Sequence, residues 1–201
     1  MIAAVVLAAG ASSRMGRPKL TIPLDGVPML ERVLKTLRRS TVDRVVVVLG
    51  ANAAELRAQV RFEGETVVVN QGFADGMSGS LRLGLGSVRD AEAAIIVLGD
   101  QPFLLPATID RLVAEHRASG AAIVVPTFHG NRGNPVLFDR SIFPQIARVS
   151  GDVGAKSVVQ SNASDVLEVE VGDRGVLVDL DTPSDLRRES KFRQGRTRVR
   201  A

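Results

Sequence analysis

The sequence predicts an α/β protein with a three-layer, doubly wound and mostly parallel sheet. Apolar runs such as VVVVL and AAIIVL are continuous rather than alternating, which is typical of strands that are covered on both faces. Segments with helical periodicity lie between these runs, and the alternation continues from residue 2 to about residue 126. This order of elements favours one central sheet with helices on both sides.

The first half of the chain alternates expected strands with expected helices. The strands are expected at Ile2–Ala8, Arg44–Leu49, Thr66–Asn70, Ala94–Leu98 and Ala121–Pro126. The helices are expected at Met29–Arg39, Ala53–Val60, Ser78–Val88 and Pro106–Ser119. The first helix has the clearest pattern, with its leucines and valine on one apolar stripe. Gly120 is expected to end the last of these helices.

The alternation breaks after Pro126, so we expect the C-terminal half to be more elaborate. Further elements are expected at Pro135–Phe138 (strand), Ser141–Arg148 (helix), Val166–Val171 (strand) and Val176–Leu180 (strand). A final helix begins with Thr182 as its N-cap, Pro183 at N1 and Asp185 at N3. Because neither a repeat nor a low-complexity linker interrupts the chain, we expect a single domain over residues 1–190.

Composition narrows the class of protein. The chain has no cysteine, which excludes disulfides, thiolate metal sites and a cysteine nucleophile. Aromatic residues make up 3% of it, which counts against a nucleic-acid binder that stacks bases on rings. No apolar segment reaches the roughly 18 residues that span a bilayer, and the start MIAAVVLAAG lacks the basic region of a signal peptide. We therefore expect a cytoplasmic protein with no membrane or nucleic-acid partner.

The basic charge is concentrated at the C-terminus. The formal net charge is +4 and the sequence pI is about 10.3. The final stretch, residues 191–201, carries only basic charged groups, namely Lys191, Arg193, Arg196, Arg198 and Arg200. Without this stretch the remaining chain is close to neutral. We expect a disordered basic tail, with contact to an anionic partner as the alternative.

The stretch VVLAAGASSRMGRPK, residues 5–19, has the composition of a phosphate-binding loop. The first strand ends near Ala8, and the small residues around Gly10 allow backbone N–H groups to approach phosphate oxygens. Arg14 then adds a planar fork and Lys19 a mobile charge. In an open α/β sheet such a loop lies at the carboxyl ends of the strands, where ligands bind. A turn of small residues with solvated charges is the alternative, and neither the Walker A nor the dinucleotide fingerprint is present.

Acidic residues supply candidate metal ligands. Asp100 follows a buried strand in IIVLGDQP and could cap the next element, but beside a phosphate loop a Mg²⁺ ligand is the better interpretation. Asp179 and Asp181 alternate along an expected strand in LVDLDTP, so both would face one side. Asp181 could instead help to cap the helix that opens at Thr182.

Leu7–Lys19 matches the pattern L-A-A-G-x-S-x-R-M-G-x-P-K and resembles the signature loop of the MobA/MocA-like nucleotidyltransferases, which include the molybdenum-cofactor cytidylyl- and guanylyltransferases. Its AAG form is closer to the cytidylyltransferase branch. Further stretches of the family pattern follow in order: PLDGVPML (23–30), GMSGSL (76–81), GDQP (99–102), RGNPVLF (132–138), GDVGAK (151–156) and DLDTPSDL (179–186).

This resemblance implies a Rossmann-like nucleotidyltransferase fold and a reaction. A phosphorylated acceptor would attack the α-phosphate of a nucleoside triphosphate and release pyrophosphate. The implied donor is CTP, the implied acceptor is molybdopterin or the molybdenum cofactor, and the implied cofactor is Mg²⁺. The nucleotide would bind in residues 1–126 and the acceptor in residues 127–190. A transient contact with a molybdoenzyme or its maturation factor is a further implication.

The resemblance also implies the roles of individual residues. Arg14, Lys19 and Asp100 are expected to be catalytic, and Asp100 and Asp181 are expected to hold the metal. The nucleotide is expected to contact Leu7, Ala8, Ala9, Gly10, Lys19, Gly76, Met77 and Ser80. The acceptor is expected to contact Asn134 and Asp152.

Other functions stay open. A guanylyltransferase of molybdenum cofactor or of another cofactor pathway would use a similar loop, as would isoprenoid, polar-lipid and sugar-phosphate nucleotidyltransferases. A non-catalytic nucleotide-binding chaperone of the cofactor is possible in principle, although Arg14, Lys19 and Asp100 together favour an enzyme. The missing dinucleotide fingerprint disfavours an NAD-type oxidoreductase.

Overall fold

The computed structural model describes residues 1–12, 15–151 and 154–188. The strands of its main sheet are β1 (Ile2–Ala8), β4 (Arg44–Leu49), β5 (Thr66–Val69), β6 (Ala93–Leu98), β7 (Ile123–Phe128), β8 (Asn131–Arg132), β9 (Val136–Asp139) and β10 (Val166–Glu170). A separate hairpin joins β2 (Pro23–Leu24) to β3 (Val27–Pro28). Its turn has positive φ at both central residues, Asp25 and Gly26, as a two-residue hairpin requires.

Helices fill the intervals between these strands. They are α1 (Met29–Arg38), α2 (Ala53–Gln59), α3 (Met77–Gly86), α4 (Pro106–Ser119), α5 (Phe143–Ile146) and α6 (Lys156–Ser161). The shorter 3₁₀ turns are η2 (Lys19–Thr21), η3 (Phe73–Asp75), η4 (Arg140–Ile142), η6 (Ala163–Asp165) and η7 (Arg174–Leu177). Residues 183–188 form a last helical turn. No helix in the described ranges is long and apolar enough to cross a membrane.

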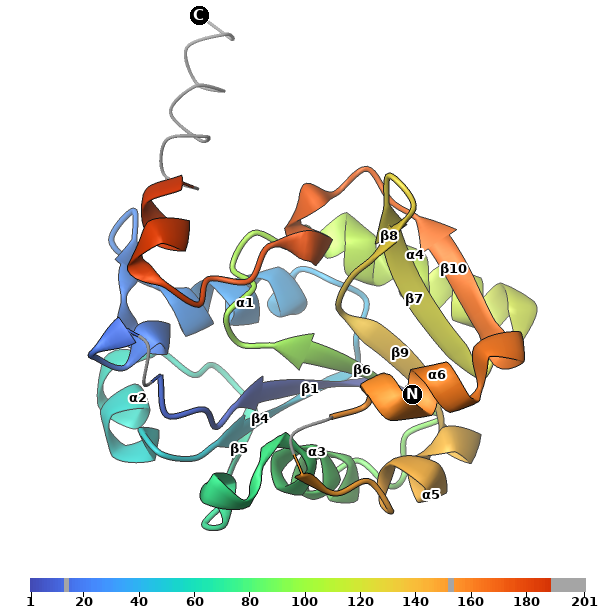
Figure 1. Cartoon of the computed structure of the whole chain (residues 1–201), viewed down its shortest axis with the longest axis horizontal. Helices are drawn as coiled ribbons and strands as arrows, with labels where there is room; N and C mark the ends of the chain where they lie inside the picture. Colours follow the sequence, from blue (N-terminus) through green and yellow to red (C-terminus); the bar gives the residue numbers. More distant parts are fainter. Residues whose placement is uncertain (13–14, 152–153, 189–201) are drawn as a thin grey trace, which may run out of the picture.

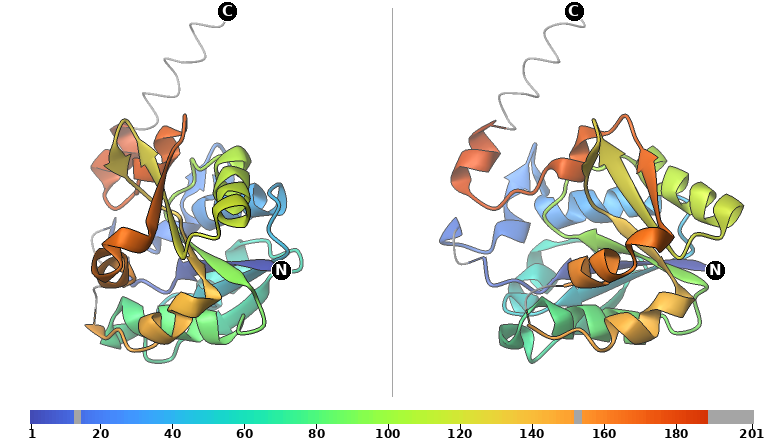
Figure 2. Two further views of the ribbon diagram at one scale, coloured as in Figure 1. Left: turned by 90° about the vertical axis from the view of Figure 1, so that its right-hand side faces the viewer. Right: turned by 45° about the vertical axis from the view of Figure 1, so that its right-hand side comes forward.

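The predicted three-layer, mostly parallel architecture is confirmed. Strand order across the sheet is β10-β7-β9-β6-β1-β4-β5, and β8 pairs with β7. The central strand β1 pairs in parallel with both β4 and β6. Helices α1 and α4 lie on one side of the sheet and α3 and α5 on the other (Figures 1 and 2).

Burial on both faces explains the continuous apolar runs. In β1, Ile2, Ala4 and Val6 face the layer that contains α1 and α4, whereas Ala3 and Val5 face the layer that contains α3. All five side chains are almost completely buried. A strand in this position has no solvent face, so its sequence shows no polar alternation.

The order of the strands creates a binding crevice. The chain passes from β1 outward to β4 and β5, and then returns across β1 to form β6 on its other side. The connections after β1 and β6 therefore leave the sheet in opposite directions. Ligands of open α/β sheets bind at such a switch point, outside the carboxyl ends of the strands.

The second half departs from the parallel pattern, as its broken rhythm indicated. Strand β9 lies antiparallel between β6 and β7. The expected strand at Val176–Leu180 is wrong, because this stretch begins inside η7 and pairs with no strand of the sheet. Asp173 accepts a hydrogen bond from Gly175 N and starts the 3₁₀ turn. Gly175 lies so close to Phe103 that a Cβ atom would come within 2.5 Å of the Phe103 carbonyl oxygen.

Candidate functional site

A cleft of about 670 Å³ lies at the carboxyl ends of β1 and β6. It is lined by the residues after β1, the start of α3 and the acids that follow β6 and η7. Every described residue that was expected to contact the nucleotide or the metal lines it, namely Leu7, Ala8, Ala9, Gly10, Lys19, Gly76, Met77, Ser80, Asp100 and Asp181. The fold thus brings together residues that lie up to 174 positions apart in the sequence.

Lys19 lies between two carboxylates in this cleft. Its Nζ atom is 2.5 Å from Asp100 Oδ2 and 2.6 Å from Asp181 Oδ1. Burial opposes the charge of Lys19, but the ion pairs and hydrogen bonds with Asp100 and Asp181 outweigh burial and raise its pKa above the ordinary value. Lys19 is therefore a fixed positive charge at neutral pH.

The backbone before Lys19 is held by Ser12. The Ser12 hydroxyl accepts a hydrogen bond from the Lys19 backbone N–H at 3.1 Å. Ser12 has a positive φ of 57°, which is uncommon for a residue with a side chain. Lys19 then opens η2, and the next residue, Leu20, is buried and fixes the turn against the core. The lysine is thus placed by its own loop and not only by its acidic partners.

Asp100 has one carboxylate oxygen that lacks a partner. Its Oδ2 pairs with Lys19, whereas Oδ1 is buried and accepts no hydrogen bond from any described group. A buried polar atom without a partner is rare and points to a missing ligand. The backbone around Asp100 is firmly placed, because its carbonyl accepts a hydrogen bond from Leu180 N at 3.2 Å.

The second acidic segment crosses beside Asp100. Asp179 Oδ1 accepts a hydrogen bond from Gln101 Nε2 at 2.6 Å. Desolvation and then repulsion by Asp100 raise the pKa of Asp179, although part of its side chain is exposed. Thr182 and Asp185 cap the following helix, because Asp185 Oδ2 accepts hydrogen bonds from Thr182 N and Oγ1. The Asp181 carboxylate pairs with Lys19 in the cleft.

The residues present suit a divalent cation that is only partly held by protein. Carboxylate oxygens are the ligands that Mg²⁺ and Mn²⁺ prefer, and the unpartnered oxygen of Asp100 is one. Over residues 1–12, 15–151 and 154–188, no three histidine, aspartate or glutamate side chains are gathered as a metal cage. A cation here would therefore complete its coordination with oxygens of water or of a bound phosphate.

The opposite wall of the cleft is built from η3 and the start of α3. Gly76 precedes α3 with φ 106° and ψ 172°, a conformation that essentially only glycine adopts. Met77 is 44% exposed, which is unusual for a large apolar side chain at the start of a helix. Ser80 is buried, and its Oγ accepts a hydrogen bond from Asn70 Nδ2 at 3.0 Å.

A second cavity of about 510 Å³ adjoins the cleft. Leu7, Met77 and Leu98 line both spaces. Asn134 lines only the second cavity, where its backbone N–H donates to Val176 O at 2.9 Å. Lys156, at the start of α6, lies on the rim of the same cavity.

Residues 4–166 match the family model of the MobA-like NTP transferase domain. The chain belongs to the MobA-like NTP transferase family. This confirms the resemblance inferred from the loop and the later motifs, and it makes the chain a nucleotidyltransferase of the MobA-like type.

Similar proteins have diverse names. Nicotine blue oxidoreductase from Paenarthrobacter nicotinovorans is 32% identical over 195 residues, which are 93% of this chain and 95% of that protein. Purine catabolism protein PucB from Bacillus subtilis (strain 168) is 33% identical over 196 residues, which are 90% and 92% of the two chains.

A solved structure is also closely similar. The crystal structure of Rv0371c from Mycobacterium tuberculosis H37Rv is 35% identical and has a TM-score of 0.84, covering 93% of this chain and 95% of that one. Rv0371c has also been solved in complex with manganese, with 34% identity, a TM-score of 0.80, and coverage of 93% and 96%.

Three expected features of this MobA-like transferase lie outside the described residues, and one expected site residue lies outside the nucleotide cleft. Arg14, Asp152 and the basic stretch 191–201 lie outside the described residues. Asn134 lies beside the nucleotide cleft and not in it.

Sequence reasoning missed several residues that shape the transferase cleft. Gln101 holds Asp179, and Asn70 holds Ser80. A Cβ atom on Gly50 would lie 2.5 Å from the Ala9 carbonyl oxygen, so Gly50 allows the end of β4 to contact the loop after β1. The available signals were the polar residues at or shortly after expected strand ends, Asn70 and Gln101, and the glycine directly after VVVVL.

Proposed function

We propose that this chain transfers a cytidylyl group from CTP to molybdopterin or the molybdenum cofactor and releases pyrophosphate. The observation that carries the proposal is Lys19, held between Asp100 and Asp181 at the carboxyl ends of β1 and β6. Positive groups that stabilise negative charge as it develops in the transition state are an effective means of catalysis. Nucleotidyl transfer brings two polyanions together, so it requires such charges.

The triphosphate would bind along the loop after β1. Ala8, Ala9 and Gly10 line the cleft there and present a backbone with little side-chain bulk. Lys19 would leave its acidic partners to pair with phosphate oxygens. Gly76, Met77 and Ser80 would contact the base and ribose from the opposite wall. Arg14 would add a second phosphate contact.

Asp100 and Asp181 would hold Mg²⁺ together with oxygens of the triphosphate. The unpartnered, buried oxygen of Asp100 supports this assignment, and the manganese complex of Rv0371c supports a divalent ion. When bound, the ion would neutralise charge on the phosphates. We assign the second ligand to Asp181 rather than Asp179, because Asp181 and Asp100 contact the same Lys19 ammonium and therefore lie next to one another, whereas Asp179 is engaged by Gln101.

The acceptor would occupy the adjoining cavity. Its floor includes Leu81, Ile96 and Phe138, which suits a flat ring system, and its rim includes Asn134 and Lys156, which suit polar and anionic groups. Asp152 would close the same site. Because the cleft and the cavity meet at shared residues, donor and acceptor phosphates would be held next to one another. An acceptor phosphate is ionised at neutral pH, so the protein need not supply a general base.

Pyrophosphate release in the presence of CTP, Mg²⁺ and molybdopterin tests the proposal. Lys19→Met and Asp100→Asn should each lower turnover by about 100-fold or more, as expected for the loss of a charge-stabilising group. Arg57→Met at an exposed position and Glu115→Gln at a partly exposed one change the same charges outside the cleft and should turn over normally. Near-normal rates in both cleft variants would contradict the assignment. Release with GTP but not CTP would support the guanylyltransferase alternative.

A binding protein without catalysis remains the main alternative within this family. Such a chaperone would bind nucleotide and cofactor, release no pyrophosphate, and pass the cofactor to a molybdoenzyme or its maturation factor. A transient contact with these proteins is also part of our proposal, and so is a cytoplasmic location. Co-purification with a molybdoenzyme in the presence and absence of CTP would test the contact.

The similarity to nicotine blue oxidoreductase favours a second candidate, an NAD-type oxidoreductase. That activity would consume a reduced nicotinamide cofactor and would not depend on Asp100 as a metal ligand. Our proposal predicts no such consumption. Oxidation of NADPH that survives Asp100→Asn would favour the oxidoreductase.

A further inference from the structure

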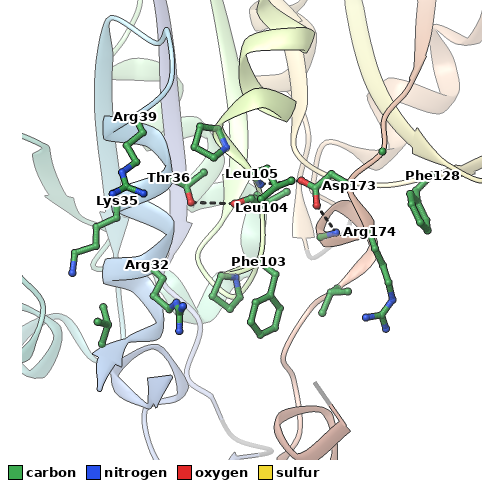
Figure 3. Close-up of a pocket in the computed structure, with 16 residues that line it drawn as sticks. Arg32, Lys35, Thr36, Arg39, Phe103, Leu104, Leu105, Phe128, Asp173 and Arg174 are labelled. Atoms are coloured by element: carbon green, nitrogen blue, oxygen red, sulfur yellow. Dashed lines mark hydrogen bonds between the residues drawn. The ribbon is translucent and has the colours of Figure 1, made fainter. Parts of the chain in front are cut away.

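Another cavity, of about 690 Å³, lies between α1, the segment after β6 and η7. Figure 3 shows Phe103 in its middle, with Arg32 and Arg174 on opposite sides of the ring. Its volume lies in the range of roughly 300–1,000 Å³ that is typical of small-molecule sites. Within the described ranges it shares no lining residue with the nucleotide cleft or the acceptor cavity. We call it the α1 cavity.

Basic side chains outnumber acidic ones in the lining of the α1 cavity. They are Arg32, Lys35, Arg39 and Arg174, and Asp173 is the single acid. Asp173 is 6% exposed, and both its oxygens already accept hydrogen bonds, from Leu105 N, Thr108 Oγ1 and Gly175 N. The four basic groups and the one acid of the lining therefore sum to a formal charge of +3.

The basic groups differ in how far the protein already engages them. Arg32 donates to the Leu24 carbonyl at 2.7 Å and to Asp25 at 3.0 Å, and Lys35 pairs with Glu31 at 2.8 Å. In the part of the chain that the structure describes, no hydrogen bond or ion pair engages the Arg39 guanidinium. A guanidinium in this state can bind a carboxylate, sulfonate or phosphate through two parallel hydrogen bonds.

Apolar surface accompanies the positive charge. Phe103 and Phe128 line the α1 cavity, and Leu105 is 50% exposed at its edge. The chain has only seven phenylalanines and neither tyrosine nor tryptophan, so two rings at one cavity are a substantial share of its aromatic surface. Rings and guanidinium groups together favour a ligand with a flat apolar body and negative substituents.

We propose that the α1 cavity binds a small, flat organic anion, and that the bound anion changes the affinity of the nucleotide cleft for a divalent cation. The second part rests on the function proposed above, whereas the first part does not.

The wall between the two sites provides the connection. Gln101 follows Asp100 and precedes the cavity residues Pro102 and Phe103. Its Nε2 donates to Asp179 in the cleft at 2.6 Å and to the Val176 carbonyl in η7 at 3.4 Å. A ligand that shifts η7 or the segment that follows β6 would therefore also shift Asp100 and Asp179. Coupling of this kind is reciprocal between the two ligands.

Isothermal titration of the full chain with a trisulfonated hydroxypyrene tests the binding. This probe is flat, aromatic and anionic. Arg39→Ser and the double variant Arg39→Ser/Arg174→Ser should progressively weaken its binding, the latter by at least about tenfold, equivalent to about 1.4 kcal/mol. Arg57→Ser/Arg117→Ser removes the same charge from α2 and α4, outside the cavity, and should bind the probe normally. Lys19→Met should also bind it normally, which separates the α1 cavity from the cleft.

The outcomes are distinguishable. No binding to the wild-type chain, or equal weakening in both double variants, would overturn the site. For the coupling, saturating probe should change the Kd for Mn²⁺ by at least about fivefold in the wild-type chain but not in Arg39→Ser/Arg174→Ser. An unchanged Kd in the wild-type chain would overturn the coupling. If the wild-type cleft binds no Mn²⁺ even in the presence of CTP, the proposed function and the coupling fail together, while the probe titration still decides the site.

Discussion

Removing Lys19 should have opposite effects on metal binding and on turnover. In the structure, the Lys19 ammonium occupies one oxygen of each proposed metal ligand, at 2.5 Å on Asp100 and 2.6 Å on Asp181. A cation that binds between these acids without nucleotide competes with this ammonium for the same two carboxylates. Lys19→Met removes the competitor but leaves both acids in place.

The magnitude follows from the two hydrogen bonds. A hydrogen bond to a charged group contributes about 1.5–3 kcal/mol. In Lys19→Met, a cation no longer has to break either hydrogen bond. Metal binding should therefore tighten by at least about tenfold, since 1.4 kcal/mol corresponds to a factor of ten. Turnover should nevertheless fall by about 100-fold or more, because the triphosphate loses its ammonium partner.

Titration with Mn²⁺ in the absence of nucleotide measures the first effect. The expected order of affinity is Lys19→Met above wild type, and wild type above Asp100→Asn. Arg57→Met, an exposed charge change on α2, should match the wild type. An affinity of Lys19→Met equal to or below that of the wild type would refute the idea that lysine and metal compete for the same carboxylates.

Three further predictions concern the walls of the cleft and the stability of the fold. Gly50→Ala places a Cβ atom 2.5 Å from the Ala9 carbonyl, so it should cost about 1–3 kcal/mol in urea unfolding and weaken CTP binding; unchanged CTP affinity would contradict the contact. Asn70→Ala removes the donor to Ser80 and the acceptor of the Gly72 N–H, so it should cost about 1 kcal/mol in urea unfolding and weaken CTP binding. Asn162→Ala, at the C-cap of α6, should leave CTP affinity unchanged, and an equal loss of CTP affinity in both variants would contradict the role of Asn70. Burial alone would raise the pKa of Glu65, but the hydrogen bonds from Arg38 and from the backbone N–H of Glu63 outweigh burial and lower this pKa. The ionised Glu65 therefore stabilises the fold above its ordinary pKa of 4.5, and this stabilisation is lost as the pH falls through the lower pKa of the folded state. Glu65→Gln should therefore flatten the fall in unfolding free energy with acid, and equal slopes in the two proteins would show that Glu65 is not responsible.

The fold was largely predictable because its core strands are buried on both faces. The unbroken apolar runs at β1, β4 and β6 leave little alternative to a covered parallel sheet. The antiparallel strand β9 and the turn η7 were harder, since both depend on contacts between distant segments. Gly175 against Phe103 is such a contact, and no local periodicity encodes it.

The candidate site was predictable to a similar extent. The carboxyl ends of parallel strands meet at one edge, so residues after β1 and β6 were expected to lie together, and Lys19 and Asp100 do. The partners that position them were not predictable, because Gln101 and Asn70 act through single hydrogen bonds across the fold. The α1 cavity gathers Arg39 and Arg174 from segments about 135 residues apart, and nothing in either segment indicates the other.

The position of the metal in a crystal with a non-hydrolysable CTP analogue and Mn²⁺ tests the central claim most directly. Our account predicts an anomalous manganese peak in contact with Asp100 and Asp181, the triphosphate along residues 8–10, and the Lys19 ammonium turned onto the phosphates. A nucleotide bound elsewhere, with Lys19 still bridging the two acids, would contradict it.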